Sequence, residues 1–314
     1  MPRRVIFDTD PGVDDSMALF FLLRSPELQL EAVTTVFGNV DVEQTTRNAV
    51  ILLDVAGRPD VPVSRGADRP LLRTRQFGGA VVHGDNGLGG AALPAPSRTE
   101  DAARAADVIV DRIMASPGEI TLIAVGPLTN VALATCLEPR IVENVQQVIV
   151  MGGAVTVPGN VSPVAEANFR NDPEAARIVL GAGFPLALVG LDVTLQAIIS
   201  PDEIDLIRAK GGAVGEFIHA ISAHYGSHYA RRSGRVGFPM HDSAAIIYAI
   251  DPGYFTTERW YLEVETQSER AAGMVMADRR GRWGQPPNAD ACVGIDAERF
   301  LKLYVERLTA PAER

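Results

Sequence analysis

Four aspartates follow an apolar segment near the start of the chain. Val5–Phe7 is expected to be a buried strand, and Asp8, Asp10, Asp14 and Asp15 come directly after it. In open α/β sheets ligands bind outside the carboxyl ends of the strands, where these side chains would emerge. Crowded carboxylates repel one another unless a cation neutralises them. Since calcium accepts carboxylates, carbonyl oxygens and waters in an irregular shell, the pattern predicts a calcium-type site.

Two other interpretations of this segment stay open. Asp14 and Asp15 suit the first turn of a helix beginning near Pro11, where the helix dipole stabilises acidic groups, but this leaves Asp8 and Asp10 without a role. Alternatively, Asp-x-Asp after a first strand is typical of magnesium-dependent aspartyl phosphotransferases. Those enzymes usually continue with Gly-Thr, whereas this chain continues with Pro-Gly-Val-Asp-Asp, so this interpretation ranks well below the calcium site.

The composition excludes several classes of partner. The chain has 314 residues and a formal net charge of -10, which argues against nucleic acid or an anionic membrane as the main partner. A small-molecule ligand fits better. Cys136 and Cys292 are far apart and have no Cys/His cluster around them, so neither a disulfide framework nor a zinc site is indicated. Without an apolar run typical of a signal core or a membrane span, we expect a cytoplasmic protein.

Short apolar runs alternate with segments of helical periodicity up to Ser200. The expected strands are Val5–Phe7, Leu30–Phe37, Ile120–Val125, Val145–Met151 and Pro185–Val189. The expected helices between them are Ser16–Arg24, Val42–Ala56, Ala102–Met114, Leu128–Leu137 and Pro173–Leu180. This alternation predicts an α/β fold with a mostly parallel, Rossmann-like open sheet covered by helices on both faces.

After Ser200 the pattern becomes mostly helical. Helices are expected at Pro201–Ala209, Ala213–Ala230 and Asp242–Ile250, strands at Trp260–Thr266 and Gly273–Ala277, and a last helix from Ala297. We interpret residues 1–314 as a single large domain with a C-terminal helical and hairpin elaboration. The segments Gly66–Pro96 and Val155–Asn171 are long, rich in Gly, Pro and Asn, and weakly patterned, which is typical of functional loops.

The segment Asp8–Leu19 resembles the N-terminal signature of the inosine-uridine nucleoside hydrolase family. Further family-like segments occur in the expected order along nearly the whole chain: Phe37-Gly38-Asn39, His83-Gly84-Asp85-Asn86-Gly87-Leu88-Gly89, Val125-Gly126-Pro127-Leu128-Thr129-Asn130, Met151-Gly152-Gly153-Ala154, Glu166-Ala167-Asn168, Asp172-Pro173-Glu174-Ala175-Ala176 and His241-Asp242. The resemblance implies an enzyme that hydrolyses the N-glycosidic bond of ribonucleosides to ribose and free base. It also implies a homodimer or homotetramer.

For the metal, the resemblance implies Ca²⁺ bound by the carboxylates of Asp10, Asp15 and Asp242 and by the main-chain carbonyl of Val125. Val125 ends an apolar strand, so its carbonyl can point into the crevice. Without the family it would be read as a core valine. Asp10 is also the implied general base, because calcium acidifies water weakly and the attacking water needs a carboxylate to take its proton.

Several polar residues resemble those that the family uses to bind the nucleoside. The implied substrate-binding residues are Asp14, Asn39, His83, Met151, Asn160, Glu166, Asn168 and Asp242. Composition alone favours a plainer interpretation of Asn39 and Asn160, each preceded by glycine, as turn residues. Met151, at the end of a buried strand, is equally a core residue.

The departing base needs a proton, and histidine is the natural donor near neutral pH. His241, beside Asp242, is the expected leaving-group acid. Four residues at helical spacing, His224, Tyr225, His228 and Tyr229, form either a lid over the base or an ordinary amphipathic face.

The segment Glu166-Ala167-Asn168 departs from the family, which often has an aromatic residue at the place of Ala167. The pocket is then either wider or filled by Phe169 from another angle. With no purine-stacking tryptophan near His83, we expect the inosine/uridine or pyrimidine type. A non-catalytic nucleoside- or ribose-binding protein is the alternative from another class, although Asp10, Asp15, His241 and Asp242 argue against it.

Overall fold

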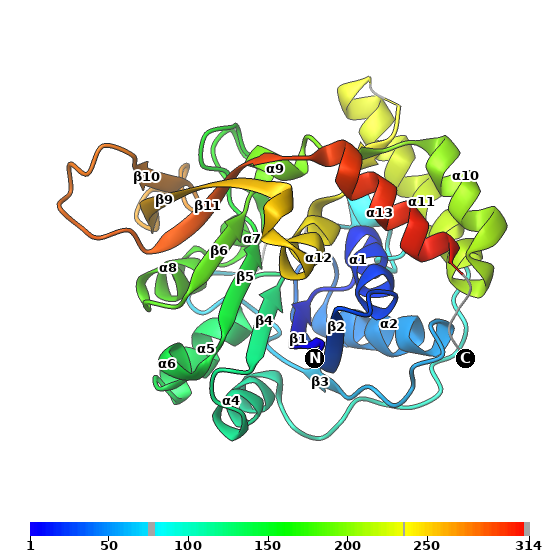
Figure 1. The fold of residues 1–314 in the computed structure, drawn as a ribbon, viewed down its shortest axis with the longest axis horizontal. Helices are drawn as coiled ribbons and strands as arrows, with labels where there is room; N and C mark the ends of the chain where they lie inside the picture. Colours follow the sequence, from blue (N-terminus) through cyan, green and yellow to red (C-terminus); the bar gives the residue numbers. More distant parts are fainter. Residues whose placement is uncertain (75–78, 235, 311–314) are drawn as a thin grey trace.

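In the computed structural model, residues 1–74, 79–234 and 236–310 are described. Nine strands form one sheet in the order β10 (Val275–Asp278), β9 (Phe255–Val264), β11 (Ala289–Ile295), β6 (Leu186–Val189), β5 (Gln147–Met151), β4 (Ile120–Ala124), β1 (Arg3–Thr9), β2 (Leu28–Thr35) and β3 (Val63–Arg65). From β3 to β11 every neighbouring pair is parallel, and β9 and β10 are antiparallel. The predicted single α/β domain with a mostly parallel sheet is confirmed (Figure 1).

Helices cover both faces of the sheet because successive residues of the buried strands point to opposite sides. In β1, Val5 and Phe7 join one hydrophobic cluster and Ile6 the other. The first cluster is covered by α1 (Val13–Leu23), α2 (Val42–Val55), α10 (Pro201–Lys210), α11 (Gly212–Ser233), α12 (His241–Ile250) and α13 (Ala297–Thr309). The second is covered by α4 (Ala105–Ala115), α5 (Thr129–Leu137), α6 (Ile141–Asn144) and α8 (Pro173–Gly181), which lie together in Figure 1.

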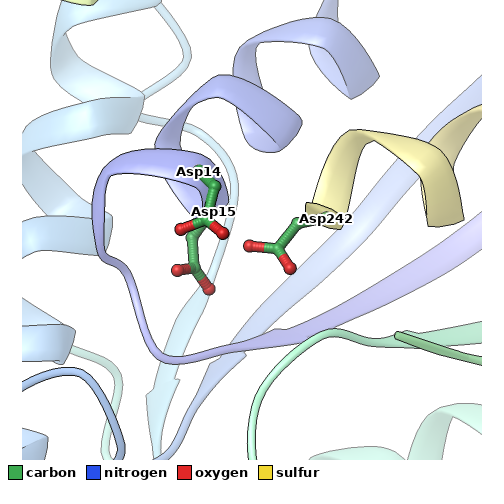
Figure 2. A group of neighbouring side chains, drawn as sticks. All are labelled: Asp14, Asp15 and Asp242. Atoms are coloured by element: carbon green, nitrogen blue, oxygen red, sulfur yellow. The ribbon is translucent and has the colours of Figure 1, made fainter. Parts of the chain in front are cut away.

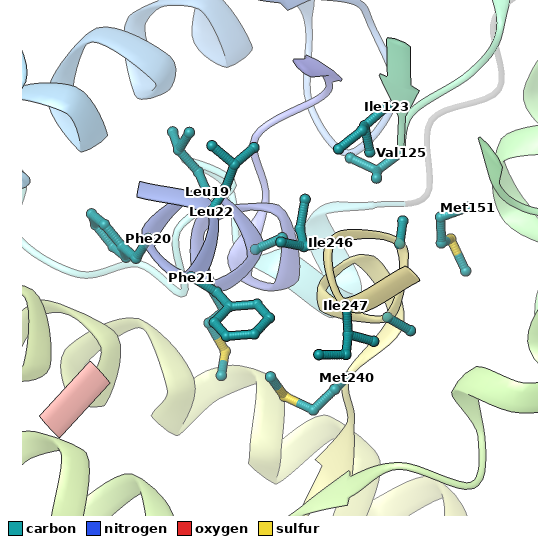
Figure 3. Close-up of a cluster of buried hydrophobic side chains, with 14 of the residues drawn as sticks. Leu19, Phe20, Phe21, Leu22, Ile123, Val125, Met151, Met240, Ile246 and Ile247 are labelled. Atoms are coloured by element: carbon teal, nitrogen blue, oxygen red, sulfur yellow. The ribbon is translucent and has the colours of Figure 1, made fainter. Parts of the chain in front are cut away.

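The helices α1 and α12 pack side by side against the centre of the sheet. Figure 3 shows Phe21 of α1 and Ile246 of α12 among the buried side chains of this layer, with Val125 and Met151 at the strand ends. Each fully buried aliphatic or aromatic side chain contributes about 1.5 to 3 kcal/mol of burial free energy. This packing holds the first turns of both helices, and the acidic residues in those turns, over the same edge of the sheet.

The C-terminal region differs from the prediction in one respect. The strands β9 and β10 form the expected hairpin, but β11 was not predicted, and it inserts between β9 and β6 so that the hairpin extends the main sheet. The sequence Ala289–Ile295 is rich in small residues and carries little strand signal. The short strand β3 was also not predicted.

The remaining elements are short. They are α3 (Ala80–His83), α7 (Ala167–Asn171), α9 (Leu191–Thr194), the two-stranded pair β7 (Ile198–Ile199) and β8 (Phe238–Pro239), and the 3₁₀ helix η1 (Pro252–Tyr254). The predicted loops Gly66–Pro96 and Val155–Asn171 are mostly irregular but contain α3 and α7, and residues 75–78 of the first lie outside the described residues. Among the described helices, none combines the length and the apolarity needed to cross a membrane.

Candidate active site

The site lies where the strand order of the sheet reverses. The segment β3-β2-β1-β4-β5-β6 has the order of a Rossmann sheet, in which ligands bind at the carboxyl ends of the first and fourth strands. The amide of Val125 donates to the carbonyl of Asp8 at 2.8 Å, so the chain leaves β1 and β4 at the same level. A cavity of about 690 Å³ opens there, and Asp10 and Val125 line it.

Three carboxylates meet in this cavity. Figure 2 shows Asp14 and Asp15 at the start of α1 facing Asp242 at the start of α12, and one oxygen of each lies within 4.8 Å of the others. Both interpretations of Asp14 and Asp15 apply, because they occupy the first turn of α1 and also point into the site. Among the described residues, Asp14 Oδ1 is buried with no hydrogen-bond partner.

Asp15 is held in place by the turn before α1. Its Oδ1 accepts from the Thr9 hydroxyl at 2.5 Å, and its Oδ2 accepts from the Gly12 amide at 2.9 Å. The side-chain amide of Asn39 also donates to Oδ2 of Asp15, at 2.9 Å. Asn39 therefore does more than form a turn, since its side chain ties β2 to the acidic cluster.

Asp10 lies beside this group rather than within it. Its Oδ2 accepts from the backbone amide of Asn39 at 2.7 Å. A Cβ added at Gly38 would lie 1.9 Å from Asp10 Oδ2, and one added at Gly126 would lie 2.7 Å from Oδ1. Glycine is required at both positions because the carboxylate of Asp10 occupies the space of their missing side chains.

The carboxylates raise one another's pKa. Burial, and then the charge of Asp15, raises the pKa of Asp10 well above its ordinary value. Burial, and then the charge of Asp14, raises the pKa of Asp242 in the same way. Burial raises the pKa of Asp14 and that of Asp15 to about 6. Such a set is stable as anions when a cation lies among them. Asp14 Oδ1, which accepts no hydrogen bond from the described residues, offers a further oxygen, so the donors fit a hard metal ion.

On the β5 side, α7 presents Glu166 and Asn168. Glu166 caps α7 by accepting from the amide of Asn168 at 2.9 Å, and it also accepts from the amide of Gly153 at 2.9 Å. The amide side chain of Asn168 donates to the carbonyls of Val125 at 2.7 Å and Met151 at 3.1 Å. These bonds fix the strand ends that border the cavity.

The possibility that Phe169 fills the space beside Ala167 is wrong. Phe169 is fully buried in the second hydrophobic cluster, on the other face of the sheet, and packs against the backbone of Gly152. Ala167 itself lines the cavity. Since Phe169 lies in the first turn of α7, its direction is set by the helix and not by the pocket.

Two histidines that line the cavity, His83 and His241, are hydrogen bonded beside the carboxylates. Nε2 of His241 lies 3.0 Å from the Tyr229 hydroxyl, and Nδ1 lies 2.8 Å from the Thr194 hydroxyl. Nδ1 of His83 accepts from the amide of Val13 at 3.2 Å, so the proton of this neutral ring is on Nε2. Burial lowers the pKa of His241 to about 3 and that of His83 to about 4.

Helix α11 combines the two roles considered for its aromatic face. Tyr225 is 1% exposed and belongs to the core, and its ring also packs against His83 with centroids 5.3 Å apart. Tyr225, His228 and Tyr229 line the cavity, whereas His224 bonds to the carbonyl of Val81.

Thr194 was not predicted as a site residue from the sequence. It is a buried residue of a four-residue helix, and its partner His241 is 47 positions away. No local pattern could have indicated this pairing. All the site residues that were predicted line the same cavity. They are Asp10, Asp14, Asp15, Asn39, His83, Val125, Met151, Asn160, Glu166, Asn168, His241 and Asp242.

A Rossmann-like sheet with a buried carboxylate cluster where its strand order reverses is typical of a class of proteins that bind a small ligand, and the cluster could also hold a metal ion. The comparisons with known proteins specify the class. The model of the inosine-uridine preferring nucleoside hydrolases matches residues 5–302, and the chain belongs to this family. The predicted enzyme class, a hydrolase acting on N-glycosyl compounds, is confirmed with it.

Similar proteins cover almost the entire chain. The pyrimidine-specific ribonucleoside hydrolase RihA of Shewanella sp. (strain MR-7) is 40% identical over 98% of this chain and 96% of its own. The non-specific ribonucleoside hydrolase RihC of Salmonella paratyphi C is 40% identical over 96% of each chain. The solved structure of the plant nucleoside hydrolase PpNRh1 superposes with a TM-score of 0.96 at 36% identity, covering 99% of this chain and 100% of that one.

Proposed function

We propose that this chain hydrolyses ribonucleosides of the inosine/uridine or pyrimidine type to ribose and free base. The observation that carries the proposal is the meeting of Asp14, Asp15 and Asp242 within 4.8 Å in the cavity that Asp10 also lines. A volume of about 690 Å³ is in the range of small-molecule sites and can hold a nucleoside. Two relatives are named as a pyrimidine-specific and a non-specific ribonucleoside hydrolase, and these names support the proposed substrate range.

For the metal we propose Ca²⁺, bound by Asp10, Asp15, Asp242 and the carbonyl of Val125. All four donors are oxygens, as calcium prefers, and calcium accepts such donors in a less regular shell than magnesium does. The bond that Val125 accepts from Asn168 leaves the carbonyl a second lone pair. When bound, the cation supplies positive charge that favours loss of a proton from a neighbouring water.

The residues around this site transfer the proton, stabilise the charge on the sugar and bind the nucleoside. Asp10 accepts the proton of the attacking water as general base. As the glycosidic bond breaks, positive charge develops on the sugar, and the surrounding carboxylates stabilise it. The nucleoside is held by hydrogen bonds in which its hydroxyls donate to the carboxylates of Asp14, Glu166 and Asp242, by hydrogen bonds with Asn39, Asn160 and Asn168, and by contacts with Met151 and His83.

We propose His241 as the group that delivers a proton to the departing base. Burial lowers the pKa of His241, so its imidazole is neutral at rest; the ring takes up a proton from solvent as negative charge develops on the base and passes it on at Nε2, directly or through the Tyr229 hydroxyl. The rings of His83, Tyr225, Tyr229 and His241 all line the cavity, and successive rings have centroid separations of 5.0 to 6.2 Å. A flat heterocycle fits against such rings.

A panel of purified nucleosides tests the proposal. Release of free ribose is measured with wild type and with Asp10→Asn, after chelation and after return of Ca²⁺ or Mg²⁺. We expect uridine, cytidine and inosine to be cleaved, chelation to abolish turnover, and Ca²⁺ to restore it better than Mg²⁺. Binding without release of base would favour the binding-protein alternative. A phosphorylated aspartate after exposure to a phosphodonor would favour the phosphotransferase alternative.

We also propose a cytoplasmic homodimer or homotetramer. The two cysteines are free thiols, Cys136 exposed and Cys292 buried, which is compatible with a reducing compartment. Light scattering coupled to size-exclusion chromatography measures the mass in solution. A monomeric mass would contradict the assembly, and fractionation of the producing cell tests the location.

A further inference from the structure

Asp192, in α9, lies outside the residues that the sequence analysis singled out. It is 5% exposed, and its carboxylate accepts three hydrogen bonds from the start of one loop. Oδ2 accepts from the amide of Val155 at 2.9 Å, and Oδ1 accepts from the amide of Thr156 at 2.7 Å and its hydroxyl at 2.6 Å. A buried carboxylate with both oxygens occupied by donors from one segment is a strong anchor.

The link from this anchor to the cavity is short and stiff. Val157 packs against the first hydrophobic cluster, and Pro158 has a fixed φ. A Cβ added at Gly159 would lie 2.1 Å from the carbonyl oxygen of Ala165, so the two arms of the loop touch there. The position of the next residue, Asn160, therefore follows the position of the anchor.

Asn160 presents its side chain to the cavity. It lines the cavity, and its Oδ1 is buried without a hydrogen-bond partner in the described part of the chain. Its backbone carbonyl accepts from the guanidinium of Arg232 at 2.6 Å, so main chain and side chain have separate roles. A buried amide oxygen without a partner is costly unless a ligand supplies the donor.

We infer that Asp192 is a positioning residue that holds Asn160 in place to bind the nucleoside. The inference rests on the proposed function, in which Asn160 is a substrate contact. The same short helix carries Thr194, which bonds to His241, so α9 positions groups at two points of the cavity. The carbonyl of Gly153 accepts from the amide of Leu191 at 2.9 Å, which fixes α9 to the end of β5.

A double-mutant cycle tests this role. The value of kcat/KM is measured for the best nucleoside of the panel, with full-length protein in Ca²⁺, for wild type, Asp192→Asn, Asn160→Ala and the double variant. The asparagine keeps the shape but turns one acceptor into a donor facing a backbone amide. We expect Asp192→Asn to lower kcat/KM about 10-fold alone, and less than about 2-fold when Asn160 is already alanine.

Equal losses in the two backgrounds, or no loss in the first, would overturn the inference. If Asp192→Asn does not fold, the same cycle is run with Thr156→Val, which removes one donor to the carboxylate, and Thr156→Ser is the matched control that keeps it. We expect the valine variant to lose activity only where Asn160 is present and the serine variant to behave as wild type. Identical behaviour of the two Thr156 variants overturns the inference.

The cycle also separates this inference from the proposed function. A wild type that releases no base contradicts the hydrolase proposal itself. An Asn160→Ala variant with unchanged kcat/KM contradicts the substrate contact of Asn160, and the inference falls with it. If the wild type is active but the losses of kcat/KM from Asp192→Asn and Asn160→Ala are additive, only the positioning role of Asp192 is contradicted.

Discussion

The Tyr225 hydroxyl donates a hydrogen bond of 3.0 Å to Oδ2 of Asp14, although the two residues are 211 positions apart. The bond joins α11, which covers the cavity, to the first turn of α1, which carries two of the three clustered carboxylates. Asp14 Oδ1 accepts no hydrogen bond from the described residues and lies 3.7 Å from Nδ1 of His83, so Tyr225 supplies the side-chain hydrogen bond that orients this carboxylate. This bond ties the position of α11 to that of the acidic cluster.

Replacing Tyr225 by phenylalanine removes this bond and keeps the ring. A hydrogen bond to a charged group is worth about 1.5 to 3 kcal/mol, so we expect kcat/KM to fall about 10-fold or more. Steady-state kinetics with uridine measures the change. Tyr304→Phe is the matched control, because Tyr304 is equally buried but lies outside the cavity, and its activity should stay within about twofold of wild type. Equal effects of the two substitutions would show that Tyr225 acts only through packing.

Asp242→Asn should separate stability from metal binding. Burial, and then repulsion from Asp14, Asp15 and Asp10, raises the pKa of Asp242, and in chelator the substitution removes this repulsion. We therefore expect Tm to rise by roughly 1 to 2 °C, the shift that corresponds to about 1 kcal/mol in a domain of 314 residues. The same variant should lose both ribose release and the increase of Tm that saturating Ca²⁺ gives the wild type.

Differential scanning calorimetry with and without Ca²⁺ measures these shifts. Asp111→Asn, at an exposed position of α4, is the control and should change neither Tm nor its response to Ca²⁺. A lower Tm of Asp242→Asn in chelator would contradict the repulsion that we describe.

Gly38→Ala tests the packing of Asp10. The new Cβ would lie 1.9 Å from Oδ2, so the carboxylate has to move. Because misplacing a catalytic group by about 1 Å can cost about 100-fold, we expect a loss of that order in kcat. Gly181→Ala at the end of α8 is the control: its Cβ meets nothing within 4 Å, and we expect unchanged kcat and stability raised by about 0.5 to 1 kcal/mol. A Gly38→Ala enzyme with normal kcat would remove Asp10 from the proposed mechanism.

The pH dependence of stability can be tested far from the metal site, at Glu31. Its hydrogen bond to Arg4 lowers the pKa of Glu31 below the ordinary value of 4.5. A lowered folded pKa stabilises the protein above the unfolded pKa, and this contribution is lost as the pH falls through the folded value. Since Arg4 is 30% exposed, we expect Glu31→Gln to cost only about 1 kcal/mol at pH 7, and less at pH values below 4.5.

Urea denaturation at several pH values measures this difference. Glu143→Gln, at an exposed position of α6, serves as the control, with a difference near zero throughout. A cost at Glu31 that grew as the pH fell would have the wrong sign for this ion pair.

The local sequence determined much of this protein. Apolar runs such as Val5–Phe7 can only be buried strands when helices of matching periodicity lie between them, and the carboxylates after β1 had to emerge at the ligand-binding edge. The motif segments and their order were sufficient to identify the family. A helix begins at His241, as the acidic residue in its first turn, Asp242, leads one to expect. These features depend on neighbours within a few positions, which a sequence displays directly.

Only the tertiary structure decided which distant groups meet. Asp242 joins Asp14 and Asp15 because α1 and α12 pack on the same face of the sheet, and Thr194 reaches His241 because α9 follows β6 at the same edge. Packing also decides that Phe169 points away from the pocket, into the second hydrophobic cluster, and that β11 pairs with β6 in the sheet. Contacts of this kind are selected by the burial free energy of whole layers, which no short pattern in the chain records.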